Sequence, residues 1–384
     1  MPENDPVVIA ARRSPIATRG RGLALLTVDQ LAAPVLRAAL EDARTVLERA
    51  EPVVDVVLGN CMGPGGNTAR VAALGAGFGH SVPGLTIDRQ CGSGLAAIIE
   101  ASRAIRAGEE GLRLAGGAES ASTAPVRSVG GVPYGRAPFV PAGFPDPDMP
   151  EAAERLAAAD RIGRARQDAY AASSHRLAAE ATAREAFAAE LVPIGGVDAD
   201  ETRRGVAALL PRFTPLFASG SVTAGNSCRV SDGAAAIALV PEGHGGARAT
   251  GGAGRLTGLA LRAHAVVGCD PGLPGIGAAP AVAAALRSAG LGVGDLAAIE
   301  IVEAFAAQTL AVLDRLGVAE DDSRLCSDGG ALALGHPWGA SGAVGVVRLF
   351  GRLVRSGAPA GTLGVAAASI GGGMGVAAVF EVVR

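Results

Sequence analysis

The stretch IDRQCGSGLAAIIEASRAIRA, residues 87–107, decides the fold of this chain. The short apolar run before it, residues 82–87, predicts a strand, and the Gly-Ser-Gly after Cys91 predicts a tight turn. Apolar residues then recur every three to four positions, which is the helical period. The pattern therefore predicts a strand, a turn and a helix, with Cys91 at the turn.

A cysteine at such a turn lies against the free N–H groups and the positive dipole end of the helix. Both favour the thiolate over the thiol, so Cys91 is a candidate nucleophile with a lowered pKa. The alternative is a buried structural cysteine, which is a common environment for this residue type. The stretch alone leaves both interpretations open.

Composition limits the classes of protein that the chain can belong to. At 384 residues, two or three domains are expected. No run of eighteen apolar residues occurs, and the N-terminus lacks a basic, apolar leader, so we expect a soluble, cytoplasmic protein. A net charge of −3 gives no reason to expect nucleic acid or an anionic membrane as a partner.

The reactive residue types exclude further chemistry. All 34 basic residues are arginine, so Schiff-base chemistry, pyridoxal phosphate attachment and a P-loop lysine are excluded. The five cysteines are scattered without C-x-x-C spacing, and none of the five histidines lies in H-E-x-x-H. We therefore expect neither a disulfide framework nor a metal site.

The second half of the chain resembles the first. CGSGLAAIIEASRAIRAG, starting at Cys91, compares with GASGAVGVVRLFGRLVRSG, starting at Gly339. This weak repeat predicts two similar α/β halves whose helix N-termini meet at a central site. One terminus carries Cys91 and the other approaches His336, which is the cysteine–histidine arrangement of nucleophilic catalysis. Between the halves, the Asp-Gly at 232–233 predicts a helix start, and residues 237–240 end that helix or form a strand.

Five segments, in this order along the chain, resemble the thiolases, a family of acyl-CoA acyltransferases: DRQCGSGLAAI, VTAGNSCRVSDGAAA, VEAFA, GGALALGHPWGASGA and SIGGGMGVAAVFE. The resemblance implies a five-layered αβαβα fold and a homodimer or homotetramer. It implies an N-terminal half over residues 1–118, completed by 219–250, a loop domain over 119–218, and a C-terminal half over 251–384.

The resemblance also implies roles for single residues. Cys91 would take an acyl group from a thioester, and His336 would be the base that activates it. The backbone N–H groups of Cys91 and Gly371 would form an oxyanion hole. The alternative for His336 is a hydrogen-bonded structural histidine. Substrate contacts are implied at three positions, Cys228, Arg229 and Phe305.

Two departures from the family pattern bear on the reaction. Ser369 stands where the family has a second cysteine, and an alcohol is too weak an acid to replace a thiolate base. Val302 stands where the family has an asparagine that holds a water in a second oxyanion hole. Lost oxyanion donors cost about 10²–10³-fold in rate. Cys228-Arg229 and Asp328 also replace the usual Ser-Gly and asparagine, so the substrate arm is expected to bind differently.

Three functions follow as hypotheses. The first is an acyltransferase that forms an acyl-Cys91 intermediate and, because the Claisen base is missing, serves specialised biosynthesis. Its donor would be a coenzyme A or acyl-carrier thioester, used as a substrate, with no tightly bound cofactor. The second is an ordinary acetyl-CoA acetyltransferase or 3-ketoacyl-CoA thiolase, with water or His336 replacing the base. The third is a non-catalytic partner subunit with a thiolase fold.

Overall fold

Two parts of the chain repeat one topology in the computed structural model, which describes residues 5–202, 205–244 and 256–384. The first half contains β1 (Pro6–Arg13), β2 (Ala17–Thr18), α1 (Val28–Leu47), β3 (Val53–Gly59), α2 (Thr68–Gly75), β4 (Gly84–Ile87), α3 (Ser93–Arg106), β5 (Leu112–Glu119) and β8 (Ser231–Pro241). The second half contains β9 (Gly258–Gly268), α7 (Ala278–Ser288), β10 (Leu296–Ile301), α8 (Ala306–Leu316), α9 (Ala331–Leu334), α10 (Trp338–Leu349), β11 (Leu363–Ile370) and β12 (Met374–Val383).

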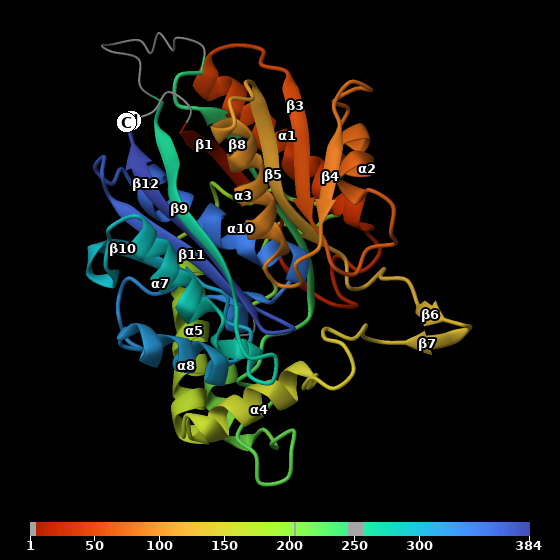
Figure 1. The fold of residues 1–384 in the computed structure, drawn as a ribbon, viewed down its shortest axis with the longest axis vertical. Coiled ribbons are helices and arrows are strands. Elements are labelled where there is room, and N and C mark those ends of the chain that lie inside the picture. The colour runs from red at the N-terminus through yellow and green to blue at the C-terminus, as the bar shows by residue number, and fades with distance from the viewer. Residues whose placement is uncertain (1–4, 203–204, 245–255) are drawn as a thin grey trace.

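Strand pairing makes the repeat explicit. In the first half, β1 pairs antiparallel with β8, β8 antiparallel with β5, and β5 parallel with β3. In the second half, β9, β12, β11 and β10 pair in the same order and with the same directions. The expectation of two similar halves is therefore confirmed. The halves join where Val7 and Val8 of β1 pair with Ala260 and Leu259 of β9 (Figure 1).

Helices make three layers around the two halves. On the first half, α1 packs outside, against β1 and β8; on the second, α7 packs outside, against β9 and β12. Between the halves, α3 and α10 pack against each other and against strands of both halves (Figure 1). The buried apolar residues accordingly form one central and two outer clusters. The order of layers is αβαβα, as the resemblance implied.

Small residues let the two central helices meet at their N-termini. A Cβ on Gly94 would lie 2.8 Å from the carbonyl oxygen of Gly339, and one on Gly342 would lie 2.8 Å from the Cβ of Leu95. Real Cβ atoms do not approach this closely, so the contact requires glycine on both helices. The glycine of the repeated Ser-Gly at each helix start is therefore needed for the close packing of the two helices.

The segment between β5 and β8 contains β6 (Arg127–Val129), β7 (Val132–Tyr134), α4 (Met149–Ala159), α5 (Arg164–Ala183) and α6 (Val206–Leu209). The hairpin of β6 and β7 extends away from the body, whereas α4 and α5 lie against α8 (Figure 1). Arg166 on α5 ties this segment to the second half through Asp314 at 2.7 Å and Glu320 at 2.6 Å. Such partly exposed pairs contribute about 0–1 kcal/mol each.

One local prediction is wrong. Residues 231–241 form the strand β8, and no helix begins at Asp232. The strand lies between β1 and β5, and each of its residues is buried. The small alanine side chains of this strand leave room for helices on both faces, and the sheet pairing overrides the local turn signal.

The expected boundary at residues 250–251 lies outside the described residues. In the described part of the chain, no helix has the length and apolar character needed to cross a membrane.

Candidate active site

The turn that carries Cys91 is held by hydrogen bonds among its own residues. The Asp88 carboxylate accepts the Gln90 N–H at 2.9 Å, and the Ser93 hydroxyl accepts the Arg89 N–H at 2.7 Å. Gln90 has a φ of 47°, in the left-handed region that non-glycine residues seldom adopt. The strand, turn and helix predicted around Cys91 are confirmed by β4 and α3.

The imidazole of His336 faces this thiol from the other half. His336 lies between α9 and α10, and its backbone N–H donates to the Arg229 carbonyl at 2.9 Å. Its Nδ1 lies 2.6 Å from the Ser341 hydroxyl, which itself donates to the Pro337 carbonyl at 2.9 Å. Ser341 must therefore accept from Nδ1–H, so Nε2 keeps its lone pair. Nε2 lies 3.3 Å from Cys91 Sγ.

Burial sets the protonation states of the pair. It lowers the pKa of His336 to about 4 and raises the pKa of Cys91 to about 12. The expected lowering of the thiol pKa by the helix terminus is therefore wrong in its net direction. The N–H groups of Cys91 and Gly371 do lower it, but desolvation and the charge of Glu119 outweigh them. At neutral pH the pair consists of a thiol and a neutral imidazole, which can accept the thiol proton.

Two backbone N–H groups converge on the Cys91 sulfur. One belongs to Cys91 itself and the other to Gly371, at the turn after β11. A Cβ on Gly371 would lie 2.7 Å from the ring of Phe139, so a larger residue could not occupy this turn without displacing the ring. The structure thus brings together Cys91, His336 and Gly371, which the sequence places in three separate blocks.

The hydroxyl of Ser369 is engaged in hydrogen bonds with its neighbours. It donates to the Gly275 carbonyl at 2.6 Å and accepts the Ala278 N–H at 3.0 Å. The Gln308 amide lies 3.5 Å from the same oxygen. Ser369 lines the pocket above Cys91, but its proton and one lone pair are used by backbone groups. These contacts agree with the expectation that Ser369 does not act as a base.

A pocket of about 430 Å³ opens above Cys91 and His336. Its larger apolar side chains come from both halves and from the inserted segment: Met62, Phe139, Met149, Leu216, Phe305 and Trp338. Cys228 also lines it, and burial together with the neighbouring Cys91 raises the pKa of that thiol. Phe305 and Cys228 thus line the same pocket as Cys91, and the substrate contacts expected of them stay predictions.

The guanidinium of Arg229 lies elsewhere than expected. It donates to the Thr18 hydroxyl at 2.9 Å and to the carbonyls of Glu201 and Ala333 at 2.8 and 2.7 Å. Arg229 is absent from the described residues that line the pocket. Because its backbone carbonyl holds His336, these contacts make it a residue that positions the histidine loop. These contacts do not favour a substrate contact for its guanidinium, and the role expected of Arg229 stays a prediction.

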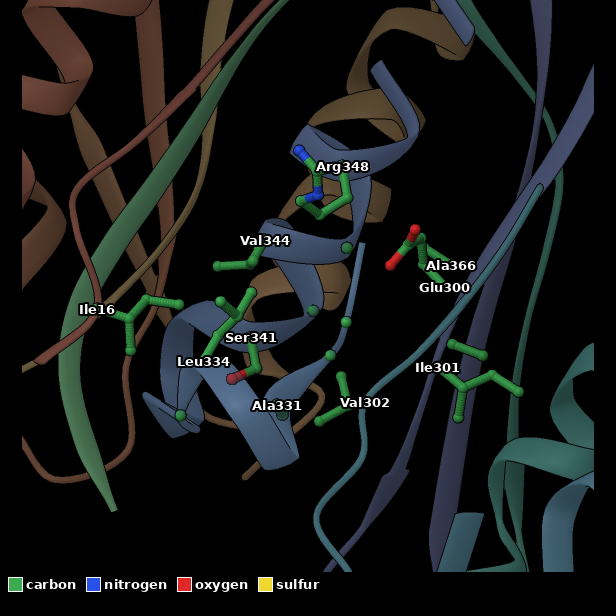
Figure 2. A pocket seen from close by; sticks show the side chains of 16 residues that line it. Ile16, Glu300, Ile301, Val302, Ala331, Leu334, Ser341, Val344, Arg348 and Ala366 are labelled. Carbon is green, nitrogen blue, oxygen red and sulfur yellow. The ribbon is translucent and has the colours of Figure 1, made fainter. Parts of the chain in front are cut away.

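Val302 also lies outside the lining of the Cys91 pocket. It lines a separate cavity of about 40 Å³ between β10 and α10, together with Ser341, Glu300 and Arg348 (Figure 2). Ser341 is the residue that holds His336, so this cavity lies behind the histidine. Asp328 is buried in ion pairs with Arg348 and Arg184 and does not line the Cys91 pocket either.

Glu119 and Ser341 are two site residues that our sequence analysis missed. The Glu119 carboxylate is fully buried at the end of β5. It accepts four N–H groups: those of Cys61, Met62 and Gly339, and the Asn60 side-chain amide. It thus ties the β3 loop to the start of α10. The sequence pattern that could have predicted Ser341 is its position five residues after His336, at a helix start. No local pattern could have predicted Glu119, because its partners are distant in sequence.

A half-buried cysteine paired with a buried histidine, at the junction of two repeated α/β halves, is typical of acyltransferases that use a thiol. The family model described as "Thiolase, N-terminal domain" matches residues 6–243, and "Thiolase, C-terminal domain" matches residues 257–382. The chain therefore belongs to the thiolase family, and it is an acyltransferase.

Relatives and solved structures agree with this assignment. The chain is 40% identical to "Putative acetyl-CoA C-acetyltransferase VraB" of Staphylococcus haemolyticus, over 98% of each chain. It is 39% identical to "Putative acetyl-CoA C-acetyltransferase YhfS" of Bacillus subtilis, over 98% of this chain and 99% of the relative. The crystal structure of the Bacillus anthracis acetyl-CoA acetyltransferase matches with a TM-score of 0.87 and 35% identity, over 99% of both chains.

Proposed function

We propose that Cys91 takes an acyl group from a coenzyme A or acyl-carrier thioester and passes it to an acceptor that needs no thiolate base to activate it. Such an acceptor is an amine, an alcohol, or a carbanion made by decarboxylation, which suits specialised biosynthesis. Coenzyme A enters as part of the substrate and not as a bound cofactor. The observation that carries the proposal is the contrast between Cys91, paired with His336, and Ser369, bonded to Gly275 and Ala278.

The first half-reaction follows from the protonation states. His336 Nε2 accepts the Cys91 proton as the sulfur attacks the thioester carbonyl carbon. The N–H groups of Cys91 and Gly371 stabilise the negative charge that develops on the carbonyl oxygen. The tetrahedral intermediate then breaks its bond to the leaving sulfur, which receives the proton from His336. The products are an acyl-Cys91 thioester and a free thiol.

The second half-reaction is limited by the residues around the acyl group. In the family, a thiolate removes a proton from the acceptor carbon, and here a hydrogen-bonded hydroxyl occupies that position. A nucleophile that already carries a lone pair or a carbanion avoids this step. His336, which returns to its neutral state after acylation, can accept the proton of an amine or alcohol acceptor.

Mass spectrometry of the intact protein tests acylation directly. After incubation with acetyl-CoA, butyryl-CoA or another candidate thioester, the protein should gain the mass of one acyl group. Cys91→Ala should abolish the gain, whereas Cys269→Ala, at a half-buried thiol outside the pocket, should retain it. If no thioester adds a Cys91-dependent mass, the proposal is wrong and a non-catalytic partner subunit becomes the better reading.

The names of the relatives favour a second candidate, an ordinary acetyl-CoA acetyltransferase. In this case water or His336 would replace the missing base. Steady-state thiolysis of acetoacetyl-CoA separates the two candidates. A turnover number within the usual enzyme range of about 1–10³ s⁻¹ favours the ordinary thiolase. Acylation without appreciable thiolysis favours transfer to another acceptor.

A further inference from the structure

The charged side chains that line the Cys91 pocket are of one sign. Two arginines, Arg127 and Arg136, are among its lining residues, and no aspartate or glutamate is among the described residues that line it. Most of the other lining side chains are apolar or small. The lining of the pocket therefore carries guanidinium groups and no carboxylate, although the net charge of the chain is negative. Such a lining favours an anionic group on the bound molecule.

The charge of Arg136 is already compensated. Its guanidinium pairs with Asp146 at 2.8 Å and with Asp148 at 3.1 Å, and it lies over the ring of Phe139 at 4.6 Å. These contacts order the segment that covers the pocket. Arg136 therefore adds little net charge to the bound state.

Arg127, at the start of β6, has a different environment. Its Nη2 donates to the Cys61 carbonyl at 2.6 Å, and the structure shows no ion pair between Arg127 and a described carboxylate. The carboxylate of Glu119 lies below the same loop, but it is fully buried and saturated by backbone and amide N–H groups. Glu119 does not line the pocket, so it is not available to Arg127 from that side.

The contact with Cys61 places the Arg127 guanidinium close to the nucleophile. Cys61 Sγ donates to the carbonyl of Gln90, the residue directly before Cys91, at 3.1 Å. Arg127 and Cys61 both line the same pocket as Cys91. A half-buried guanidinium is costly to desolvate unless an anion accompanies it, and its planar fork matches a carboxylate in two parallel hydrogen bonds.

We infer that Arg127 binds a carboxylate at the far end of the acyl group, so that the preferred acyl donors are monothioesters of short dicarboxylic acids. This inference rests on the proposed acylation of Cys91 and names its substrate class. The chemical step is unchanged: the bond from the acyl carbon to the donor sulfur breaks, the bond to Cys91 Sγ forms, and the thiol proton leaves with the donor sulfur through His336. The distal carboxylate takes no part in bond making.

The phosphates of coenzyme A are a second source of negative charge for the same guanidinium. The pantetheine arm separates these phosphates from the reacting sulfur. Arg127, by contrast, donates to the carbonyl of Cys61, and the Cys61 thiol donates to the carbonyl of Gln90, directly before Cys91. This placement favours the acyl carboxylate. Thioesters of N-acetylcysteamine, a short thiol without phosphate, separate the two sources experimentally.

The experiment compares isosteric pairs of these thioesters: succinyl with butyryl, and glutaryl with valeryl. The rate of Cys91 acylation is followed by mass spectrometry. We expect at least one dicarboxylic member to react faster than its uncharged partner by about tenfold to a hundredfold, the range for a hydrogen-bonded charge pair. Arg127→Gln should abolish this ratio, and Arg127→Lys should restore part of it. Arg176→Gln, at an exposed ion pair with Glu180 outside the pocket, is the matched control and should leave the ratio unchanged.

Each outcome decides a different point. Using a ratio within one variant cancels a general loss of folding or reactivity. If uncharged thioesters acylate Cys91 and no dicarboxylic preference appears, or if Arg127→Gln leaves it unchanged, the inference is overturned while the proposed function stands. A further outcome is that Arg127→Gln slows acylation by all coenzyme A thioesters equally and leaves acylation by every N-acetylcysteamine thioester unchanged. In that case Arg127 binds the phosphates of coenzyme A, and the inference is again wrong. If no thioester acylates Cys91, the proposed function and the inference fail together.

Discussion

His336 Nε2 lies 3.3 Å from Cys91 Sγ, although 245 residues separate the two along the chain. The helices α3 and α10, which follow them, pack against each other between the two halves. Glycine at the helix starts permits this approach, so the position of the pair depends on the packing of small residues. The predictions below test what this pairing requires.

The first prediction concerns pH. Burial lowers the pKa of His336 to about 4 and raises the pKa of Cys91 to about 12, so the reactive thiol–imidazole pair is unchanged between these values. The acylation rate should therefore be flat from about pH 5.5 to 9 and fall below that range as the imidazole gains a proton. Stopped-flow acylation across this range is the measurement. An inflection between pH 6 and 8 that disappears in His336→Asn would contradict it.

The second prediction concerns Ser341, which accepts the Nδ1–H of His336 and donates to the Pro337 carbonyl. Ser341→Ala should lower kcat by about 10–100-fold with little change in KM, because loss of such a supporting contact disturbs ring orientation and tautomer. Ser341→Thr keeps the hydroxyl and should retain more activity. Equal losses in both variants would point to altered packing at this position and not to loss of the hydrogen bond.

The third prediction concerns Glu119, whose charge contributes to the raised pKa of Cys91. Glu119→Gln removes that charge and should shift the pH dependence of iodoacetamide alkylation of Cys91 to lower pH. The variant also replaces one of the two acceptor oxygens by an NH2 group, so two of the four N–H groups lose their acceptor and stability should fall by about 1–3 kcal/mol. Thermal unfolding separates the two effects. An unchanged alkylation profile in a folded variant would show that this charge does not act on the thiol.

The fourth prediction concerns the two altered family positions. Ser369→Cys restores a thiol on β11, and Val302→Asn restores an amide at the end of β10. The double variant should thiolyse acetoacetyl-CoA faster than the wild type, and Ser369→Cys alone should gain less. Steady-state kinetics of both single variants and the double variant provide the comparison. No gain in the double variant would place the obstacle to Claisen chemistry elsewhere in the site.

The fifth prediction concerns the contact of the central helices. A Cβ at Gly94 would lie 2.8 Å from the Gly339 carbonyl and 3.0 Å from the Ala343 nitrogen, both on the backbone. Gly94→Ala should therefore cost about 1–3 kcal/mol in stability and reduce acylation, because it separates Cys91 from His336. Gly163→Ala meets no atom within 4 Å and serves as the control. If both variants unfold at the same temperature, the close approach does not contribute to stability.

The sequence alone determined the local elements and the family of this protein. The strand, turn and helix around Cys91, the repeat of the two halves and the order of the five family segments could be predicted, because helical period, turn residues and short motifs are properties of neighbouring residues. The departures expected at Ser369 and Val302 were also predicted from short motifs and stay predictions.

Only the tertiary structure decided the electrostatic state of the site and the places of several side chains. Burial reversed the expected pKa direction at Cys91, sheet pairing made residues 231–241 a strand, and long-range contacts turned Arg229 away from the substrate pocket. The position of Arg127 beside Cys61 follows from the same cause. Desolvation and hydrogen bonding depend on which distant segments come into contact, and that information belongs to the packed molecule and not to any local pattern.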